Sequence, residues 1–181
     1  VGDMNTKDYT TAHMSRKVGY VFQNPDDRIF HSTILDEVSF GPTILGYDEN
    51  RKKELIEFSL GLAGIKRLRN QNLYSIPLSI RKMVTIASII AMDTEVMIFD
   101  EPTAGQDLRG ISQLAKIIGE LNAMGKTLIT ITHDMEFVAN NFKDVIVMAD
   151  KEIIARGTPN EIFWDFPVLK KARIKQPYLG R

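Results

Sequence analysis

Two adjacent carboxylates, Asp100 and Glu101, directly follow the apolar residues 96–99 and precede the turn-former Pro102. A short apolar run bounded by turn-forming residues is typical of a strand that is buried on both faces of a parallel sheet. A carboxylate at the end of such a strand loses hydration, which is unfavourable unless a cation, a hydrogen-bond donor or a proton compensates. The pair is therefore either an ordinary strand end that reaches solvent or part of a site that binds a cation.

Two further apolar runs also end in polar side chains. Gln23 follows the run at residues 18–22, and His133 follows the run at residues 127–132. In an open parallel sheet, ligands bind beyond the carboxyl ends of the strands. We therefore expect Gln23, the acid pair and His133 to meet at one edge of the sheet, where they would suit a metal-bound anion.

Helical segments alternate with these three runs. Apolar residues at spacings of three and four predict helices over residues 33–40, 49–64, 79–91, about 111–124 and 135–142. Gly41 and Pro42 are expected to stop the first of these helices, and Gly125 the fourth. Residues 145–148 and 152–155 predict a hairpin at a sheet edge, and Thr158 begins a capping box that starts a last helix. This order predicts an α/β fold with a parallel sheet.

Composition excludes several classes of protein. The 181 residues carry a formal net charge of +0, so no overall field favours nucleic acid as a partner. The absence of cysteine excludes a disulfide scaffold and a thiolate metal site. No apolar run approaches the roughly 20 residues that span a bilayer. We expect a soluble, cytoplasmic chain that is one domain or part of one.

Four motifs in sequence order resemble those of the nucleotide-binding domain of ABC-type ATPases. Residues 21–25 resemble the Q-loop, 96–102 the Walker B segment, 104–107 the D-loop and 131–134 the H-loop. Three further stretches, at 19–27, 36–42 and 157–163, are similar in particular to ATPase subunits of energy-coupling factor transporters. These transporters import vitamins and transition-metal ions such as cobalt and nickel.

The resemblance implies a fold and a domain division. The expected fold class is α/β, a parallel-sheet P-loop NTPase core with a helical subdomain of the ABC ATPase type. The helical subdomain would cover residues 33–92, the catalytic core 15–32 and 93–157, and a C-terminal helix and tail 158–181. No Gly-x-x-x-x-Gly-Lys-Ser/Thr phosphate loop occurs in these residues. We therefore expect an N-terminally truncated domain, which by itself binds ATP poorly and is inactive.

The resemblance also implies roles for single residues, with ATP and Mg²⁺ as cofactors. Asp100 would hold Mg²⁺ with help from Gln23, and Glu101 would activate the attacking water as general base. Gln23 would also report the state of the γ-phosphate to a membrane partner, and His133 would donate to that phosphate. Asp107 would lie at a dimer interface, although it could simply cap the next helix. The remaining histidines, His13 and His31, are expected to be structural.

The implied function is an ATPase subunit that energises a membrane importer from the inner face of the cell membrane. Its expected partners are a second ATPase subunit and transmembrane transporter subunits, with no nucleic acid. The alternative is a catalytically impaired scaffold that keeps the dimer and transporter contacts. An ABC-type ATPase of DNA repair or translation would need a coiled-coil insertion or basic arms, and the sequence has neither.

The segment that corresponds to the family's Leu-Ser-Gly-Gly-Gln signature departs from that pattern. Pro77 replaces the serine, Leu78 and Ser79 the glycines, and Ile80 the glutamine. The hydroxyl donor and the close backbone approach that glycine permits are both lost. Ser79 is expected to cap the following helix and so keep some contact with the ATP bound to the partner. In a heterodimer, the site completed by this segment would turn over slowly.

Overall fold

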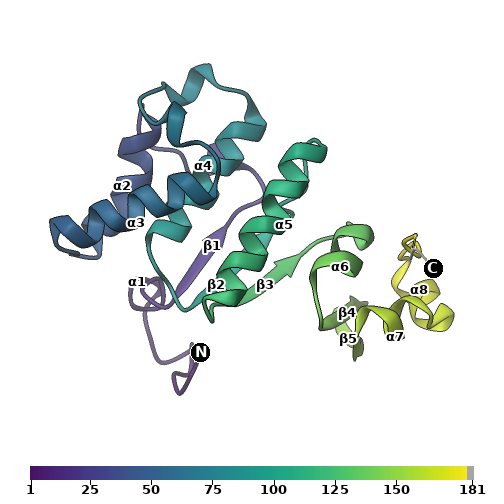
Figure 1. The fold of residues 1–181 in the computed structure, drawn as a ribbon. Coiled ribbons are helices and arrows are strands. Elements are labelled where there is room, and N and C mark those ends of the chain that lie inside the picture. The colour runs from purple at the N-terminus through teal and green to yellow at the C-terminus, as the bar shows by residue number, and fades with distance from the viewer. Residues whose placement is uncertain (179–181) are drawn as a thin grey trace. The chain divides into compact units, whose positions relative to one another are not determined.

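The computed structural model describes residues 1–178, and the chain divides into two compact units. The first unit is formed by Val1–Ile131, and the second begins at Thr132. The first unit contains a parallel sheet with helices, and the second contains a hairpin with short helices (Figure 1).

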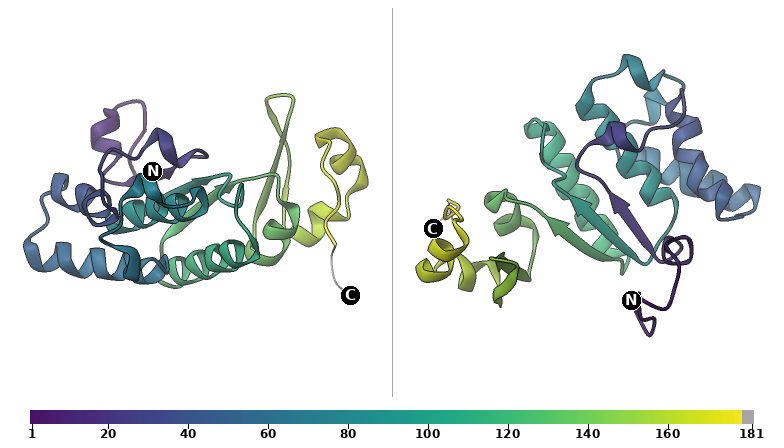
Figure 2. Two further views of the ribbon diagram at one scale, coloured as in Figure 1. Left: turned by 90° about the horizontal axis from the view of Figure 1, so that it is seen from above. Right: turned by 180° about the vertical axis from the view of Figure 1, so that it is seen from behind.

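Three parallel strands form the sheet of the first unit. They are β1 (Val18–Val21), β2 (Val96–Asp100) and β3 (Thr127–Ile131), in the order β1-β2-β3. The right-hand view of Figure 2 shows the three strands side by side, pointing the same way. This arrangement confirms the predicted parallel sheet.

One face of this sheet is buried and the other is not. Gly19 and Val21 of β1 lie beside Met97 and Phe99 of β2 on the buried face. Two helices, α4 (Leu78–Ala91) and α5 (Leu108–Ala123), pack on that face, and a Cβ on Gly19 would lie 2.5 Å from Ile89 Cγ2 of α4. On β3, Ile129 is 47% and Ile131 51% exposed. The prediction that the strand at residues 96–99 is buried on both faces is therefore wrong: Ile98 on the other face is only half-buried, because α4 and α5 both cover the same face.

The helices α2 (Ile34–Ile44) and α3 (Glu49–Leu62) pack with α4 into a helical layer. The predicted stop at Gly41 and Pro42 is wrong, because α2 continues through both residues. Gly41 lies against α4, where a Cβ would come 2.5 Å from Met92 Cγ, and Pro42 is buried. This packing compensates for the hydrogen bond that the proline cannot donate. The helix ends instead before Gly46, which adopts φ +78°.

The buried side chains of the first unit come from both layers. Among the most enclosed apolar ones are Val21, Ile34, Val38, Leu60, Ile65, Leu73, Val84, Ile86, Met97, Phe99, Leu114, Ile117 and Leu121. Four shorter elements complete the first unit, namely α1 (Thr11–Met14) and the 3₁₀ turns η1 (Pro25–Asp27), η2 (Lys66–Leu68) and η3 (Leu73–Ser75). The predicted helices from residues 49, 79 and 111 correspond to α3, α4 and α5 and are confirmed.

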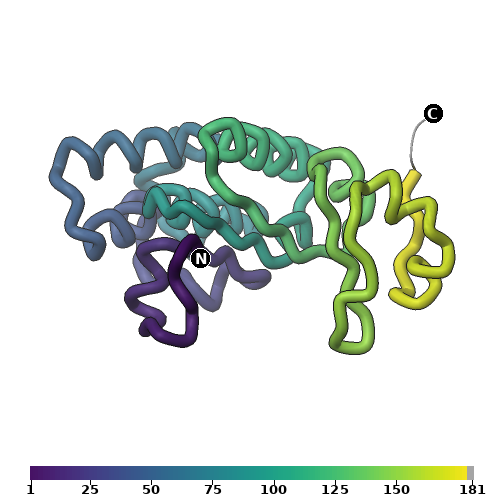
Figure 3. Tube along the Cα trace, turned by 90° about the horizontal axis from the view of Figure 1, so that it is seen from below, coloured from purple at the N-terminus to yellow at the C-terminus, as the bar shows by residue number. Residues whose placement is uncertain are grey.

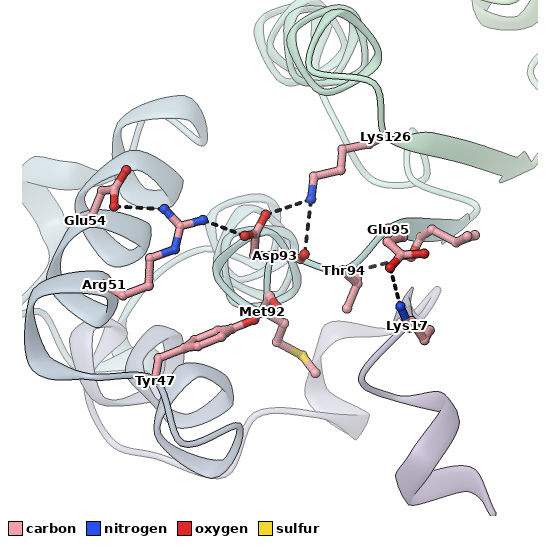
Figure 4. Close-up of polar contacts among 10 residues, drawn as sticks. Lys17, Tyr47, Arg51, Glu54, Met92, Asp93, Thr94, Glu95 and Lys126 are labelled. Atoms are coloured by element: carbon pink, nitrogen blue, oxygen red, sulfur yellow. Dashed lines mark hydrogen bonds and ion pairs between the residues drawn. The ribbon is translucent and has the colours of Figure 1, made fainter. Parts of the chain in front are cut away.

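An ion network lies at the amino end of β2. Asp93, in the turn between α4 and β2, accepts from Arg51 of α3 at 2.6 Å and from Lys126 at 2.7 Å (Figure 4). Lys126 also donates to the Asp93 carbonyl at 3.1 Å, and Arg51 pairs with Glu54 at 2.8 Å. Because Lys126 directly precedes β3, this network ties the helical layer to two strands of the sheet.

The second unit contains α6 (Met135–Asn141), β4 (Val145–Ala149), β5 (Glu152–Gly157), α7 (Pro159–Phe163) and α8 (Phe166–Ala172). The two strands pair antiparallel, and Figure 3 shows them side by side up to their turn. This confirms the predicted hairpin, although β4 and β5 form a two-stranded sheet of their own rather than an edge of the larger one. The predicted capping box at Thr158 and Glu161 is also confirmed. Val147, Ile162, Phe163 and Leu169 form the core of this unit.

Over the described residues, none of the helices combines the length and the apolar character needed to cross a lipid bilayer.

Candidate functional site

The register of β1 on β2 brings Gln23 to the acid pair. Val21 of β1 pairs with Phe99 of β2, so Gln23 and Glu101 are each two residues beyond a paired position. Gln23 is exposed, whereas Asp100 and Glu101 are half-buried. Gln23 and the acid pair therefore follow the carboxyl ends of two neighbouring strands, and their meeting in one site stays a prediction.

Glu101 has an unusual and well-anchored backbone. Its φ angle is +44°, in the left-handed region that non-glycine residues rarely adopt. Its amide donates to the Ile131 carbonyl at the end of β3, at 2.8 Å. Its carbonyl accepts from the Ala104 amide at 3.2 Å and from the Lys82 ammonium group at 2.6 Å. The peptide groups on both sides of this residue are therefore fixed by neighbouring elements.

Lys82 of α4 is among the most buried side chains of the protein, with 2% exposure. Its Nζ donates to the carbonyl oxygens of Glu101 and, at 3.3 Å, of Ala104. Burial lowers the pKa of Lys82, while the charges of Glu101 and Asp100 act in the opposite direction. Lys82 is not among the site residues predicted from the sequence. The signal was a lysine one turn before Ile86 on the buried face of the helix, where an unpaired ammonium would be costly.

Asp100 accepts a hydrogen bond from the Tyr20 hydroxyl of β1, at 2.9 Å from Oδ2. That hydrogen bond raises the pKa of Tyr20, and burial and the negative charge of Asp100 act in the same direction. Among the residues that the structure describes, no three His, Cys, Asp or Glu side chains cluster as a metal cage. The Asp100 carboxylate fits Mg²⁺, which takes one or two carboxylates and fills its shell with water and phosphate.

The turn after the acid pair contacts the start of α4. The Gln106 amide group donates to the Ser79 carbonyl at 3.3 Å. Asp107 caps α5, since its carboxylate accepts from the Gly110 amide at 2.8 Å. The capping interpretation of Asp107 is thus confirmed, and its place at a dimer interface stays a prediction.

The predicted cap at Ser79 is wrong. Pro77 occupies the N-cap position in an extended conformation, and its carbonyl accepts the first hydrogen bonds of α4, from Ile80 and Arg81. The helix begins at Leu78, so Ser79 already has helical dihedral angles and does not cap the helix. The start of α4 has no side-chain cap.

The three histidines differ in their surroundings. His133 belongs to the second unit, two residues after the end of β3, and its role at the phosphate stays a prediction. Nδ1 of His31 lies 3.1 Å from the carboxylate of the buried Glu37, which also accepts from the His31 amide. The His13 ring stacks on Tyr9, with centroids 5.0 Å apart. The structural interpretation of His13 and His31 is consistent with these contacts.

Comparison with known proteins agrees with this arrangement. The model of the ABC transporter family matches residues 2–104, more than half of the chain. The chain belongs to the ABC transporter family. An energy-coupling factor transporter ATP-binding protein, EcfA, of Methanocaldococcus jannaschii is 39% identical over 162 residues, which are 90% of this chain and 58% of that protein.

Two solved structures of this family are also similar. One is cbiO1 of Clostridium perfringens, described as part of the ABC transporter complex cbiONQ, with 31% identity and a TM-score of 0.77. The match covers 90% of this chain and 65% of cbiO1, so the chain spans less than two thirds of both cbiO1 and EcfA. The other, a dimeric ATP-binding cassette bound to ADP and Pi, has 22% identity and a TM-score of 0.76 over 88% of this chain and 72% of that one. It supports the ABC ATPase fold class predicted from the motifs.

Proposed function

We propose that this chain belongs to an ATP-binding and ATP-hydrolysing subunit that energises a membrane importer of the energy-coupling factor type. The observation that carries the proposal is the acid pair at the end of β2, with Glu101 anchored at φ +44° and Gln23 beside it by register. The similarity to EcfA and to cbiO1 supports the transporter class.

Each residue of this edge has a place in the proposed reaction. Phosphoryl transfer depends mostly on positioning and on neutralising phosphate charge, which bound Mg²⁺ would supply. Asp100 would hold the metal, and Gln23 would help to hold it and orient the water. Glu101 would accept the proton of the attacking water as general base. His133, in the second unit, would donate to the γ-phosphate.

A cavity beside the loop that follows Gln23 supports the proposal that the protein binds a transmembrane subunit. This cavity of about 650 Å³ lies along β1, and Phe22, Pro25, Phe30 and Phe40 line part of it. Phe30 is 67% exposed and Phe40 is 44% exposed. An exposed aromatic surface next to the proposed phosphate-reporting residue suits contact with a transmembrane subunit, which would place the protein peripherally at the inner face of the membrane.

The test uses the full-length protein that contains this chain, purified with its partner ATPase and transmembrane subunits. ATP hydrolysis and ATP-dependent uptake of Co²⁺, Ni²⁺ or vitamins are measured in proteoliposomes. Glu101→Gln should lower turnover by about 100-fold or more while ATP binding is kept. A turnover rate that is indifferent to this substitution would reject the hydrolytic role, and ATP-driven export would reject the importer class.

One observation favours a second function, that of an impaired partner subunit in a heterodimer. The start of α4 carries Pro77 at the N-cap and no side-chain cap, so the serine hydroxyl of the family signature has no substitute there. The ATP site completed by this segment would then turn over slowly. Restoring Ser at 77 and Gly at 79 should raise the turnover of that site, and an unchanged rate would remove this second function.

A further inference from the structure

The buried lysine of this site, Lys82, donates to backbone carbonyl groups. Lys82 reaches from α4 to the turn after β2, where Nζ donates to the carbonyls of Glu101 and Ala104 at 2.6 and 3.3 Å. These two carbonyls belong to the first and the last residue of the tight turn that begins at Glu101, the proposed general base. The same Glu101 carbonyl also accepts from the Ala104 amide, so the lysine and the turn bond converge on one oxygen atom.

The backbone that Lys82 holds is one that glutamate does not adopt readily. A left-handed φ brings Cβ close to the following carbonyl and persists only where surrounding contacts fix it. The amide side of Glu101 is fixed by Ile131 of β3, and the carbonyl side is fixed from α4 by Lys82. Without the second anchor, the peptide after Glu101 loses its bond to α4 and keeps the turn bond from the Ala104 amide, so it rotates more readily. The direction in which the side chain leaves the backbone changes with that rotation.

We propose that Lys82 is a positioning residue for Glu101, which holds the left-handed peptide that sets the direction of the carboxylate toward the attacking water. This inference rests on the proposed function, because it assigns a task to Lys82 only if Glu101 is the general base. A misplacement of about 1 Å in a reacting group lowers rates by about 100-fold. The loss of the Lys82 ammonium group is therefore expected to act on the chemical step.

The central variant is Lys82→Met in the full-length ATPase, assembled with its partner subunits. Methionine keeps an unbranched apolar stem in the buried site but removes the donor. We expect kcat for ATP hydrolysis to fall by about tenfold to 100-fold, with KM for ATP and the affinity for ATP within about twofold of wild type. Lys82→Gln keeps a donor on a shorter side chain and should recover part of kcat.

The matched control is Lys126→Met at the other end of β2. Lys126 is also largely buried and also donates to a backbone carbonyl, that of Asp93 at 3.1 Å. It lies outside the proposed site, so its loss should lower the thermal unfolding midpoint and leave kcat per folded molecule unchanged. Comparing the two variants separates the destabilisation caused by removing a buried ammonium group from the loss of kcat caused by a misplaced Glu101 carboxylate.

A second comparison places Lys82→Met in the Glu101→Gln background and measures single-turnover rates. If Lys82 acts through Glu101, the substitution lowers the residual rate of Glu101→Gln by less than twofold. An equal loss of rate in both backgrounds would overturn the inference, as would a Lys82→Met variant that loses only thermal stability in the manner of Lys126→Met. If Lys82→Met does not fold, the same criteria are applied to Lys82→Gln.

The outcomes distinguish this inference from the proposed function. If Glu101→Gln keeps wild-type turnover, the proposed function fails and the inference fails with it. If Glu101→Gln is inactive while the Lys82 variants keep wild-type kcat, only the inference fails.

Discussion

The two ends of β2 use cations in different ways. At the amino end, the Asp93 carboxylate binds two cations, Arg51 and Lys126, through side-chain contacts of 2.6 and 2.7 Å. At the carboxyl end, Lys82 donates to the backbone carbonyls of Glu101 and Ala104. In the first arrangement, two cations compensate the charge of the Asp93 carboxylate. In the second, the Lys82 ammonium group holds the backbone conformation of the turn after β2.

This difference corresponds to the proposed tasks of the two ends. A carboxylate that is paired with two cations contributes to stability but has little capacity left for a ligand. A lysine that donates to main-chain oxygens next to two acids would instead fix the backbone from which those acids extend. Substitutions at the amino end should therefore change the free energy of unfolding, and substitutions at the carboxyl end should change turnover.

The largest expected effect is that of Asp100→Asn. The asparagine oxygen still accepts the hydrogen bond from Tyr20, so the unfolding midpoint should change little. ATP turnover in the assembled complex should fall by about 100-fold or more, because the charge that would hold Mg²⁺ is lost. The measurement is steady-state hydrolysis over a range of Mg²⁺ concentrations. Near-normal turnover at every Mg²⁺ concentration would contradict the assignment of Asp100.

Asp93→Ala should have the largest effect on stability at the amino end. It leaves Lys126 and Arg51 without their shared partner and places alanine at φ +54°, which together should cost about 2–3 kcal/mol. Asp93→Asn is the matched control, because asparagine tolerates the left-handed conformation, and it should cost about 1 kcal/mol less. Urea denaturation measures both, and kcat per folded molecule should equal that of wild type. A loss of kcat would show that the two ends of β2 are not independent.

The pH dependence of the unfolding free energy tests whether the Asp93 carboxylate stabilises the amino end of β2. Burial alone would raise the pKa of Asp93, but the hydrogen bonds from Lys126 and Arg51 outweigh it and leave the pKa below its ordinary value. The carboxylate therefore contributes stability that is complete above the unfolded-state pKa of about 4 and is lost as the pH falls through the lower folded-state pKa. The stability difference between wild type and Asp93→Asn should shrink as the pH falls below about 4. A stability difference that grows as the pH falls would contradict the prediction that the pKa of Asp93 is lowered by folding.

Local patterns in the sequence were sufficient for much of this architecture. Apolar runs bounded by turn residues correctly located the three parallel strands, and the polar residues after the first two follow the carboxyl ends of neighbouring strands. Gln23, Asp100 and Glu101 could be placed together because the ends of parallel strands meet at one edge. Their catalytic roles stay proposals, as does that of His133.

Features that depend on tertiary contacts were missed or predicted wrongly. Pro42 is a helix breaker by its local chemistry, but packing on α4 keeps it inside α2. Lys82 and Asp93 are ordinary charged residues in the sequence, and their importance appears only when partners about 20 to 40 residues away come into contact. The exposure of β3 likewise depends on which face of the sheet the helices cover.

The smallest expected effect concerns the second ion pair at the amino end, between Lys17 and Glu95 (Figure 4). The side chains are 41% and 64% exposed, so water competes for both charges, and ordering a long lysine side chain offsets much of the attraction. A double-mutant cycle with Lys17→Ala and Glu95→Ala should give a coupling free energy of about 0.5 kcal/mol or less, which decreases further in high salt. A coupling above about 1 kcal/mol that is insensitive to salt would contradict this prediction. It would mean that burial is not what separates the Asp93 network from an ordinary surface ion pair.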